Sequence, residues 1–149
     1  MSELEDLLGI ATEEVIETMF YSAVFGPGTE AAEGPYLSAE VTFTGSRSGA
    51  LEVSAPQSTA TVLAAAFLGE NADSVADTQV PAIIGELANV MCGVVLGRLE
   101  QGGQFAIAPP QVSRMEGPAA SHRGVRRVFE IEEGTVSIGL TLDPLSANG

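Results

Sequence analysis

The sequence predicts an α+β fold in which a long central helix and an N-terminal helix pack on an antiparallel sheet. Two observations favour this class. Apolar residues recur at helical spacing from Ser2 to Phe25 and again from Gln79 to Glu100, whereas several other segments alternate apolar and polar residues and are joined by short turns. These helices and hairpins do not alternate regularly, as they would around a parallel sheet. With 149 residues, the chain suits a single domain over residues 1–149.

The first predicted element is a helix over Ser2–Phe25. Its apolar side chains fall at helical spacing, at Leu4, Leu7, Leu8, Ala11, Val15, Ile16, Met19 and Phe20. Ser2 and Glu5 stand three positions apart, which fits a capping box at the start of the helix. The glycines and proline of residues 26–28 are expected to end it, and the small and polar residues up to Pro35 are expected to form a loop.

From Leu37 the period changes to two, which predicts a strand over Leu37–Thr44 with one buried face. The turn residues 45–49 and the renewed alternation at Leu51 and Val53 predict a hairpin. A short alanine-rich helix is expected over Ser58–Leu68, closed by a glycine.

The longest helical segment is predicted over Gln79–Glu100, with Pro81 in its first turn, where the backbone N–H groups lack partners within the helix. The remainder of the chain is expected to form strands. Their predicted bounds are Gln104–Ala108, Val112–Met115, Val125–Ile131 and Thr135–Leu142. The turn residues 132–134 predict a second hairpin between the last two strands.

Charge excludes several function classes. The chain has 20 Asp+Glu against six Lys+Arg, a formal net charge of -14, and all six cations are Arg. Such a chain repels phosphate backbones and anionic lipid headgroups, so we expect no nucleic-acid partner and no membrane surface. The absence of Lys removes Walker-type phosphate loops and Schiff-base chemistry.

The chain is also poor in metal-binding and nucleophilic residues. One Cys excludes a disulfide framework and a thiolate zinc site, and one His disfavours a His-rich metal site or a Ser-His-Asp triad. We therefore expect no metal ligands. The N-terminus is acidic and lacks a cleavage site, and the longest apolar stretch is interrupted by Glu86, Asn89 and Arg98. These features predict a cytoplasmic protein.

The helix predicted at Gln79–Glu100 has two unlike faces. With Glu86 placed at zero on a wheel of 100° per residue, Gly93 and Gly97 fall about 20° to either side, and Asn89 and Ala82 lie within about 60°. The opposite face collects Ile84, Leu87, Ala88, Met91, Val94, Val95 and Leu99. Arg98 falls among these apolar positions and is expected to extend its guanidinium to solvent from the helix end.

The first of these faces allows two interpretations. A glycine inside a helix costs about 1 kcal/mol relative to alanine, so Gly93 and Gly97 need an explanation. The glycines can allow close packing inside the molecule, for example against the N-terminal helix, with Asn89 bonded to a neighbouring carbonyl. Alternatively, the smooth stripe allows another protein to approach closely, with Glu86 and Asn89 projecting toward it.

The residues Glu86-Leu-Ala-Asn89-Val-Met-Cys-Gly93 resemble the E-x-x-N-x-x-x-G signature of the CheC/CheX/FliY group of chemotaxis phosphatases. The residues on either side agree. Residues 41–45 and 49–53 are similar to the hairpin that precedes the short helix in CheX-like proteins, and residues 104–110 resemble the strand and prolines that follow their active helix. The resemblance covers about residues 10–142 and implies a CheX/CheC-like α+β domain with that core.

The resemblance implies a phosphatase that hydrolyses the aspartyl phosphate of a CheY-like response-regulator receiver. Asn89 matches the family's Asn, which orients the attacking water, and Glu86 matches the Glu that pairs with the receiver's Lys. The stripe formed by Ala82, Val90, Gly93 and Gly97 would then face the partner. The Mg²⁺ would lie on the receiver, and this chain would bind no cofactor.

The chain departs from the family pattern in two places. Glu14-Val-Ile-Glu17 has Glu where two-site CheC-type members carry a second Asn, so the resemblance favours a one-site, CheX-like protein. Val94 stands where CheX-type motifs often carry Asn. A non-catalytic receiver-binding or flagellar-switch adaptor is the alternative function, and a purely structural sheet-forming dimer is a third. CheX-like proteins dimerise through sheet edges, which implies a homodimer.

Two further groups of residues have competing interpretations. Arg123, Arg126 and Arg127 form a cationic cluster that either offsets local acidic charge or contacts the acidic rim of a receiver. Cys92 is expected to be a small core residue and not a nucleophile.

Overall fold

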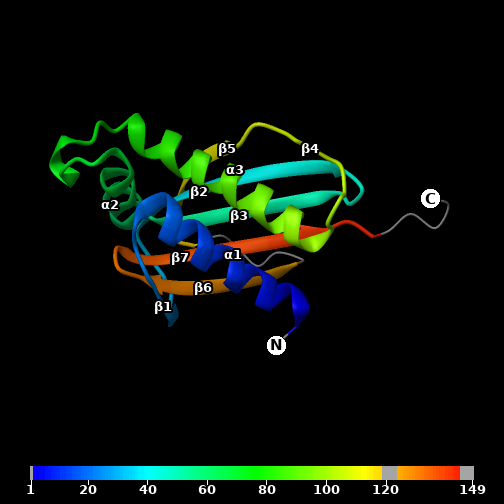
Figure 1. The fold of residues 1–149 in the computed structure, drawn as a ribbon. Coiled ribbons are helices and arrows are strands. Elements are labelled where there is room, and N and C mark those ends of the chain that lie inside the picture. The colour runs from blue at the N-terminus through cyan, green and yellow to red at the C-terminus, as the bar shows by residue number, and fades with distance from the viewer. Residues whose placement is uncertain (1, 119–123, 145–149) are drawn as a thin grey trace.

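The computed structural model describes residues 2–118 and 124–144, and it confirms the α+β class (Figure 1). The helices are α1 (Glu3–Phe20), α2 (Gln57–Leu68) and α3 (Gln79–Leu99), with a 3₁₀ turn at η1 (Ala72–Ser74). The strands are β1 (Val24–Pro27), β2 (Pro35–Gly45), β3 (Gly49–Pro56), β4 (Phe105–Ile107), β5 (Gln111–Glu116), β6 (Val125–Ile131) and β7 (Gly134–Leu142). Every strand predicted from the sequence is present, with ends that differ by up to two residues.

All seven strands belong to one antiparallel sheet with the order β1-β6-β7-β3-β2-β4, and β5 pairs with β2 farther along the same edge as β4. The predicted hairpins are confirmed as β2–β3 and β6–β7. Figure 1 shows α1 and α3 crossing one face of this sheet side by side and running in opposite directions. The helix layer therefore presents α3 above β2 and β3, and α1 above β6 and β1.

The start of α1 follows the prediction and its end does not. Ser2 accepts a hydrogen bond from the Glu5 backbone, and the Glu5 carboxylate accepts one from Ser2, as a capping box requires. The helix expected to reach Phe25 ends at Phe20, where Tyr21 adopts a left-handed backbone conformation with φ 54°. Residues 24–27, expected to be helix and loop, form β1 instead, because they pair with β6 at the sheet edge.

The core lies between the sheet and the helices. Of the residues predicted for the buried face of α3, Ile84, Leu87, Ala88, Met91 and Val95 have no exposed surface, whereas Val94 and Leu99 are partly buried and pack against this core. By length and composition α3 could span a membrane, with a mean hydropathy of 1.8 in its most apolar 18-residue window, but 50% of that window is buried inside the protein. The apolar face of α3 is therefore used for packing.

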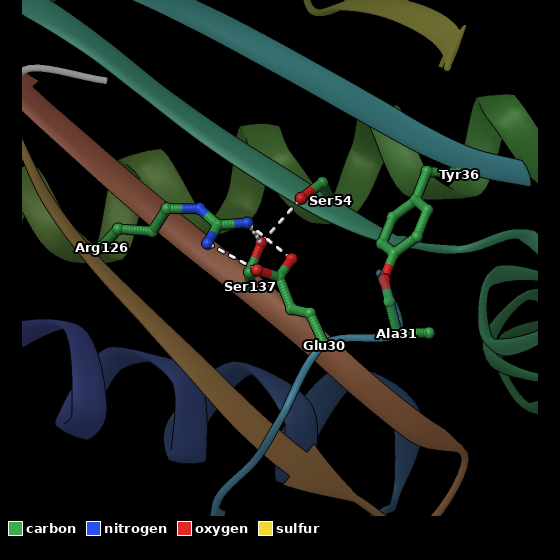
Figure 2. Close-up of polar contacts among 6 residues, drawn as sticks. All are labelled: Glu30, Ala31, Tyr36, Ser54, Arg126 and Ser137. Carbon is green, nitrogen blue, oxygen red and sulfur yellow. Dashed lines mark hydrogen bonds and ion pairs between the residues drawn. The ribbon is translucent and has the colours of Figure 1, made fainter. Parts of the chain in front are cut away.

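On the other face of the sheet, an ion pair fixes the segment between β1 and β2. Arg126 donates two hydrogen bonds of 2.6 Å to the Glu30 carboxylate and one of 3.0 Å to the Ser137 hydroxyl, which is itself 2.6 Å from the Ser54 hydroxyl (Figure 2). The Tyr36 hydroxyl donates to the Ala31 carbonyl. The bond to Glu30 raises the pKa of Arg126. These contacts hold residues 28–34 against the face that α1 and α3 leave open.

Candidate functional site

The face of α3 that points away from the sheet carries the predicted site residues. Ala82, Glu86, Gly93 and Gly97 are exposed, while Asn89 and Val90 are half-buried at its sides. Glu86 and Asn89 stand three positions apart on an unbroken helix, so their side chains leave the same face. We call Ala82, Glu86, Asn89, Val90, Gly93 and Gly97 the α3 stripe. Its position is set by the apolar face opposite, which fixes the rotation of the helix on the sheet.

The glycines of α3 divide into two kinds. A Cβ added at Gly85 would lie 3.2 Å from Val112 and 3.3 Å from Pro110, so this glycine allows close internal packing against the chain around β5. Added at Gly93 or Gly97, it would meet nothing within 4 Å. Internal packing therefore explains Gly85 but not the two glycines of the stripe. Because these two glycines have no side chain, they leave the solvent-facing surface of α3 flat.

The two polar residues of the stripe are free to engage a partner. Neither the Glu86 carboxylate nor the Asn89 carboxamide is held by a hydrogen bond or ion pair to any residue that the structure describes. The interpretation in which Asn89 bonds a neighbouring carbonyl is therefore wrong. An amide that can both accept and donate hydrogen bonds projects next to a carboxylate from a surface without bulky side chains. Such a pair can position a water molecule and bind a cation that another molecule brings.

Cys92 lies in the core and is not part of the stripe. Its side chain has no exposed surface, and burial raises the pKa of its thiol to about 11. At neutral pH the thiol is therefore protonated and shielded from reagents. The structure confirms its predicted place as a small core residue.

The described arginines of the cationic cluster do not reach the stripe. Arg126 extends to the sheet face opposite the helices, where it binds Glu30. Arg127, on the other side of β6, donates to the Glu5 carbonyl at 3.0 Å and lies 4.9 Å from the centre of the Phe129 ring. These contacts favour the interpretation in which the cationic cluster offsets local acidic charge over the one in which it contacts a receiver. Arg123 lies outside the described residues.

Within residues 2–118 and 124–144, no group of three or more His, Cys, Asp or Glu side chains is arranged to hold a metal ion.

A groove between α1 and α3 has no counterpart in the sequence prediction. It has a volume of about 410 Å³ and lies between the first half of α1 and the last residues of α3. Its lining residues are Glu3, Leu4, Asp6, Leu7, Ile10, Arg98 and Leu99. Ile10 is 49% exposed and is missing from the predicted apolar face of α1. An apolar residue outside that face is the one signal in the sequence that could have indicated this groove.

Comparison with protein families gives a match that covers most of the chain. The family model described as chemotaxis phosphatase CheX matches residues 37–132, a range that contains α2, α3, most of β2 and the whole of β3, β4, β5 and β6. No curated protein sequence matches the chain.

Solved structures of similar fold include CheX proteins and a FliY protein. A chemotaxis protein CheX from Desulfovibrio desulfuricans is 26% identical, with a TM-score of 0.76, and the match covers 95% of this chain and 100% of that one. CheX in a CheX-CheY-BeF3-Mg²⁺ complex from Borrelia burgdorferi is 18% identical, with a TM-score of 0.70 and coverage of 95% and 99%. FliY from Thermotoga maritima is 16% identical, with a TM-score of 0.60 and coverage of 99% and 92%.

Proposed function

The chain belongs to the CheX family of chemotaxis phosphatases, and from this membership we propose that it hydrolyses the aspartyl phosphate of a CheY-like response-regulator receiver. The observation that carries the proposal is the α3 stripe. It presents Glu86 and Asn89, unpaired, beside two glycines that internal packing does not require. In the Borrelia burgdorferi structure a CheX protein of the same fold is in complex with CheY.

The proposed reaction needs positioning and charge stabilisation from this chain. Asn89 accepts a hydrogen bond from a water molecule and directs it at the phosphorus, in line with the bond to the receiver's aspartate. That phosphorus–oxygen bond breaks, which leaves a carboxylate on the receiver and releases inorganic phosphate. A neutral carboxamide suits this task because it adds no negative charge beside the phosphoryl group. Glu86 binds the receiver's Lys and fixes the orientation of the two proteins.

The remaining parts of the site would come from the partner. We propose that the Mg²⁺ that accompanies phosphoryl transfer is held by the receiver, and that this chain supplies no ligand to it. The encounter of a protein of net charge -14 with a phosphorylated, carboxylate-lined site is opposed by long-range repulsion. Since salt screens that repulsion, we expect association with the receiver to become faster at higher ionic strength. We further propose that the enzyme acts in the cytoplasm, as its family membership suggests.

The direct test is release of phosphate from CheY-type receivers phosphorylated with acetyl phosphate. We expect the wild-type protein to shorten the lifetime of the phosphorylated receiver at substoichiometric concentration. Binding to a receiver loaded with beryllofluoride and Mg²⁺, without faster phosphate release, would identify the non-catalytic adaptor instead. Absence of both across several receivers would contradict the proposal.

We also propose that the protein is a homodimer joined through β5. The two outer edges of the sheet differ, because β1 is four residues long, has an irregular register and ends in Pro27, all of which oppose further pairing. Strand β5 spans Gln111–Glu116 and is paired on one side with β2. Light scattering should give a mass near twice 15.3 kDa, and a proline at Ser113 should reduce it to the monomer value.

A further inference from the structure

We propose that two copies of the chain join their β5 strands about a two-fold axis at Met115, so that Arg114 of each copy forms an ion pair with Glu116 of the partner subunit. This inference rests on the homodimer proposed above and adds the register and the two residues that select a second copy as the partner of this edge. Three observations carry it: the open edge of β5, two opposite charges on one face of that strand, and the symmetry of their spacing.

The outer edge of β5 is open to another strand. In the part of the chain that the structure describes, β5 pairs only with β2, along the whole of Gln111–Glu116. Its outer backbone N–H and C=O groups therefore have no strand beside them, and a second chain can add at such an edge. The strand contains no proline and its register to β2 has no shift, so its backbone is regular enough for further pairing.

This edge strand carries two opposite charges on one face. Arg114 and Glu116 stand two positions apart, so both side chains leave the same side of the sheet. That side faces the helices, because Val112, two residues before Arg114, is the neighbour of Gly85 in α3. Arg114 and Glu116 are exposed, and neither has an ion-pair or hydrogen-bond partner among the described residues. A partner strand with the same two charges at the same spacing can therefore satisfy both.

A second copy supplies this charge pattern in one register. Opposite residues in an antiparallel pair face the same side of the sheet, so a two-fold axis passes through a residue and pairs the residue before it with the one after it on the other strand. An axis at Met115 puts Arg114 opposite Glu116 of the partner subunit twice. An axis at Arg114 or Glu116 puts like charges opposite each other, which is destabilising. An axis at Ser113 or Val112 leaves both charges without an opposite charge across the interface.

Two further residues favour the axis at Met115. Met115 is half-buried opposite Tyr36, on the face of the sheet away from the helices, so this axis brings together two copies of a flexible apolar side chain. Glu33 lines the same pocket as Glu116 at the end of β5, and it also has no ion-pair partner among the described residues. The arginine of a second copy would therefore approach two carboxylates at this place.

The experiment reverses each charge in turn and then combines the two reversals. Arg114→Glu and Glu116→Arg are measured alone and as an equimolar mixture, in which a mixed dimer has the same total charge as the wild-type dimer. Arg98→Glu and Glu70→Arg are the matched controls, because they change the net charge equally from exposed positions outside the sheet. The readout is the dimer dissociation constant from sedimentation equilibrium, and thermal unfolding shows that each variant folds.

We expect each charge reversal alone to raise the dimer dissociation constant at least about tenfold, because both interfacial pairs become like-charged, and the mixture to dimerise within about twofold of wild type. The two controls should dimerise as the wild type does. If Arg114→Glu and Glu116→Arg also do so, or if their mixture is no tighter than either alone, the register is overturned and the homodimer stands. If the wild type is monomeric, the register and the homodimer are both overturned, while the phosphatase proposal stands.

Discussion

Replacement of Asn89 with alanine is expected to lower the rate of receiver dephosphorylation at least about 100-fold and to leave receiver binding within about twofold of wild type. The carboxamide is the neutral polar side chain of the stripe and can orient a water molecule without adding charge, and loss of a positioning group of this kind typically costs a factor of about 100 or more. Because Asn89 is half-buried and has no partner among the described residues, its removal should not destabilise the protein.

Single-turnover decay of a phosphorylated receiver measures this effect, and Kd for the beryllofluoride-loaded receiver measures binding separately. Asn71→Ala serves as the matched control, because Asn71 is exposed ahead of η1 and its side chain makes no capping hydrogen bond. Turnover by Asn89→Ala at the wild-type rate would show that another residue orients the water. A parallel loss of binding and turnover would mean instead that Asn89 acts in docking.

Replacement of Gly93 with leucine should change docking and stability in opposite directions. We expect Kd for the receiver to rise at least about 100-fold, because the new side chain stands between Glu86 and Asn89 and a partner that approaches the helix. The free energy of unfolding should rise by close to 1 kcal/mol, since leucine is a better helix former and its Cβ meets nothing within 4 Å. Urea denaturation provides the second measurement.

Gly85→Ala is the control for Gly93→Leu, because it changes a glycine of the same helix that faces the interior of the protein. Its Cβ would stand 3.2–3.3 Å from Val112 and Pro110, so the gain in helix propensity should be offset by crowding. Receiver binding should be unaffected, because Gly85 is buried. Unchanged docking of Gly93→Leu would exclude the α3 stripe as the receiver surface, and a loss of stability would show that Gly93 has a packing role.

The sequence predicted the elements whose patterns are local. In α3 the buried positions repeat at helical spacing over 21 residues, so its bounds and rotation followed from the sequence with Glu86 and Asn89 on the open side. In β2 and β3 buried residues alternate with more exposed ones over residues 39–44 and 50–53, on either side of a turn with glycines at both ends. The sequence could not decide whether Gly93 allows close packing inside the molecule or approach by another protein, because a glycine is the same letter in either environment.

The features that could not be predicted depend on distant parts of the chain. Strand β1 contains Gly26 and Pro27, which are poor strand residues, and it forms because β6 lies beside it. The end of α1 at Tyr21 has the same origin, since a left-handed residue there turns the chain toward that edge. The groove beside Ile10 exists because the start of α1 lies beside the end of α3. The spacing of apolar residues within one helix does not predict where a second helix lies.

The ion pair between Glu30 and Arg126 joins residues that are 96 positions apart, and this separation sets when it can form. Closing so long a loop for one contact would cost about 4 kcal/mol of chain entropy. Once β1 has paired with β6 through Pro27 and Phe129, however, only residues 28–29 separate Pro27 from Glu30, and only residues 127–128 separate Phe129 from Arg126. The ion pair therefore completes folding and does not begin it, and residues 28–34 should exchange their amide hydrogens before the strands beneath them do.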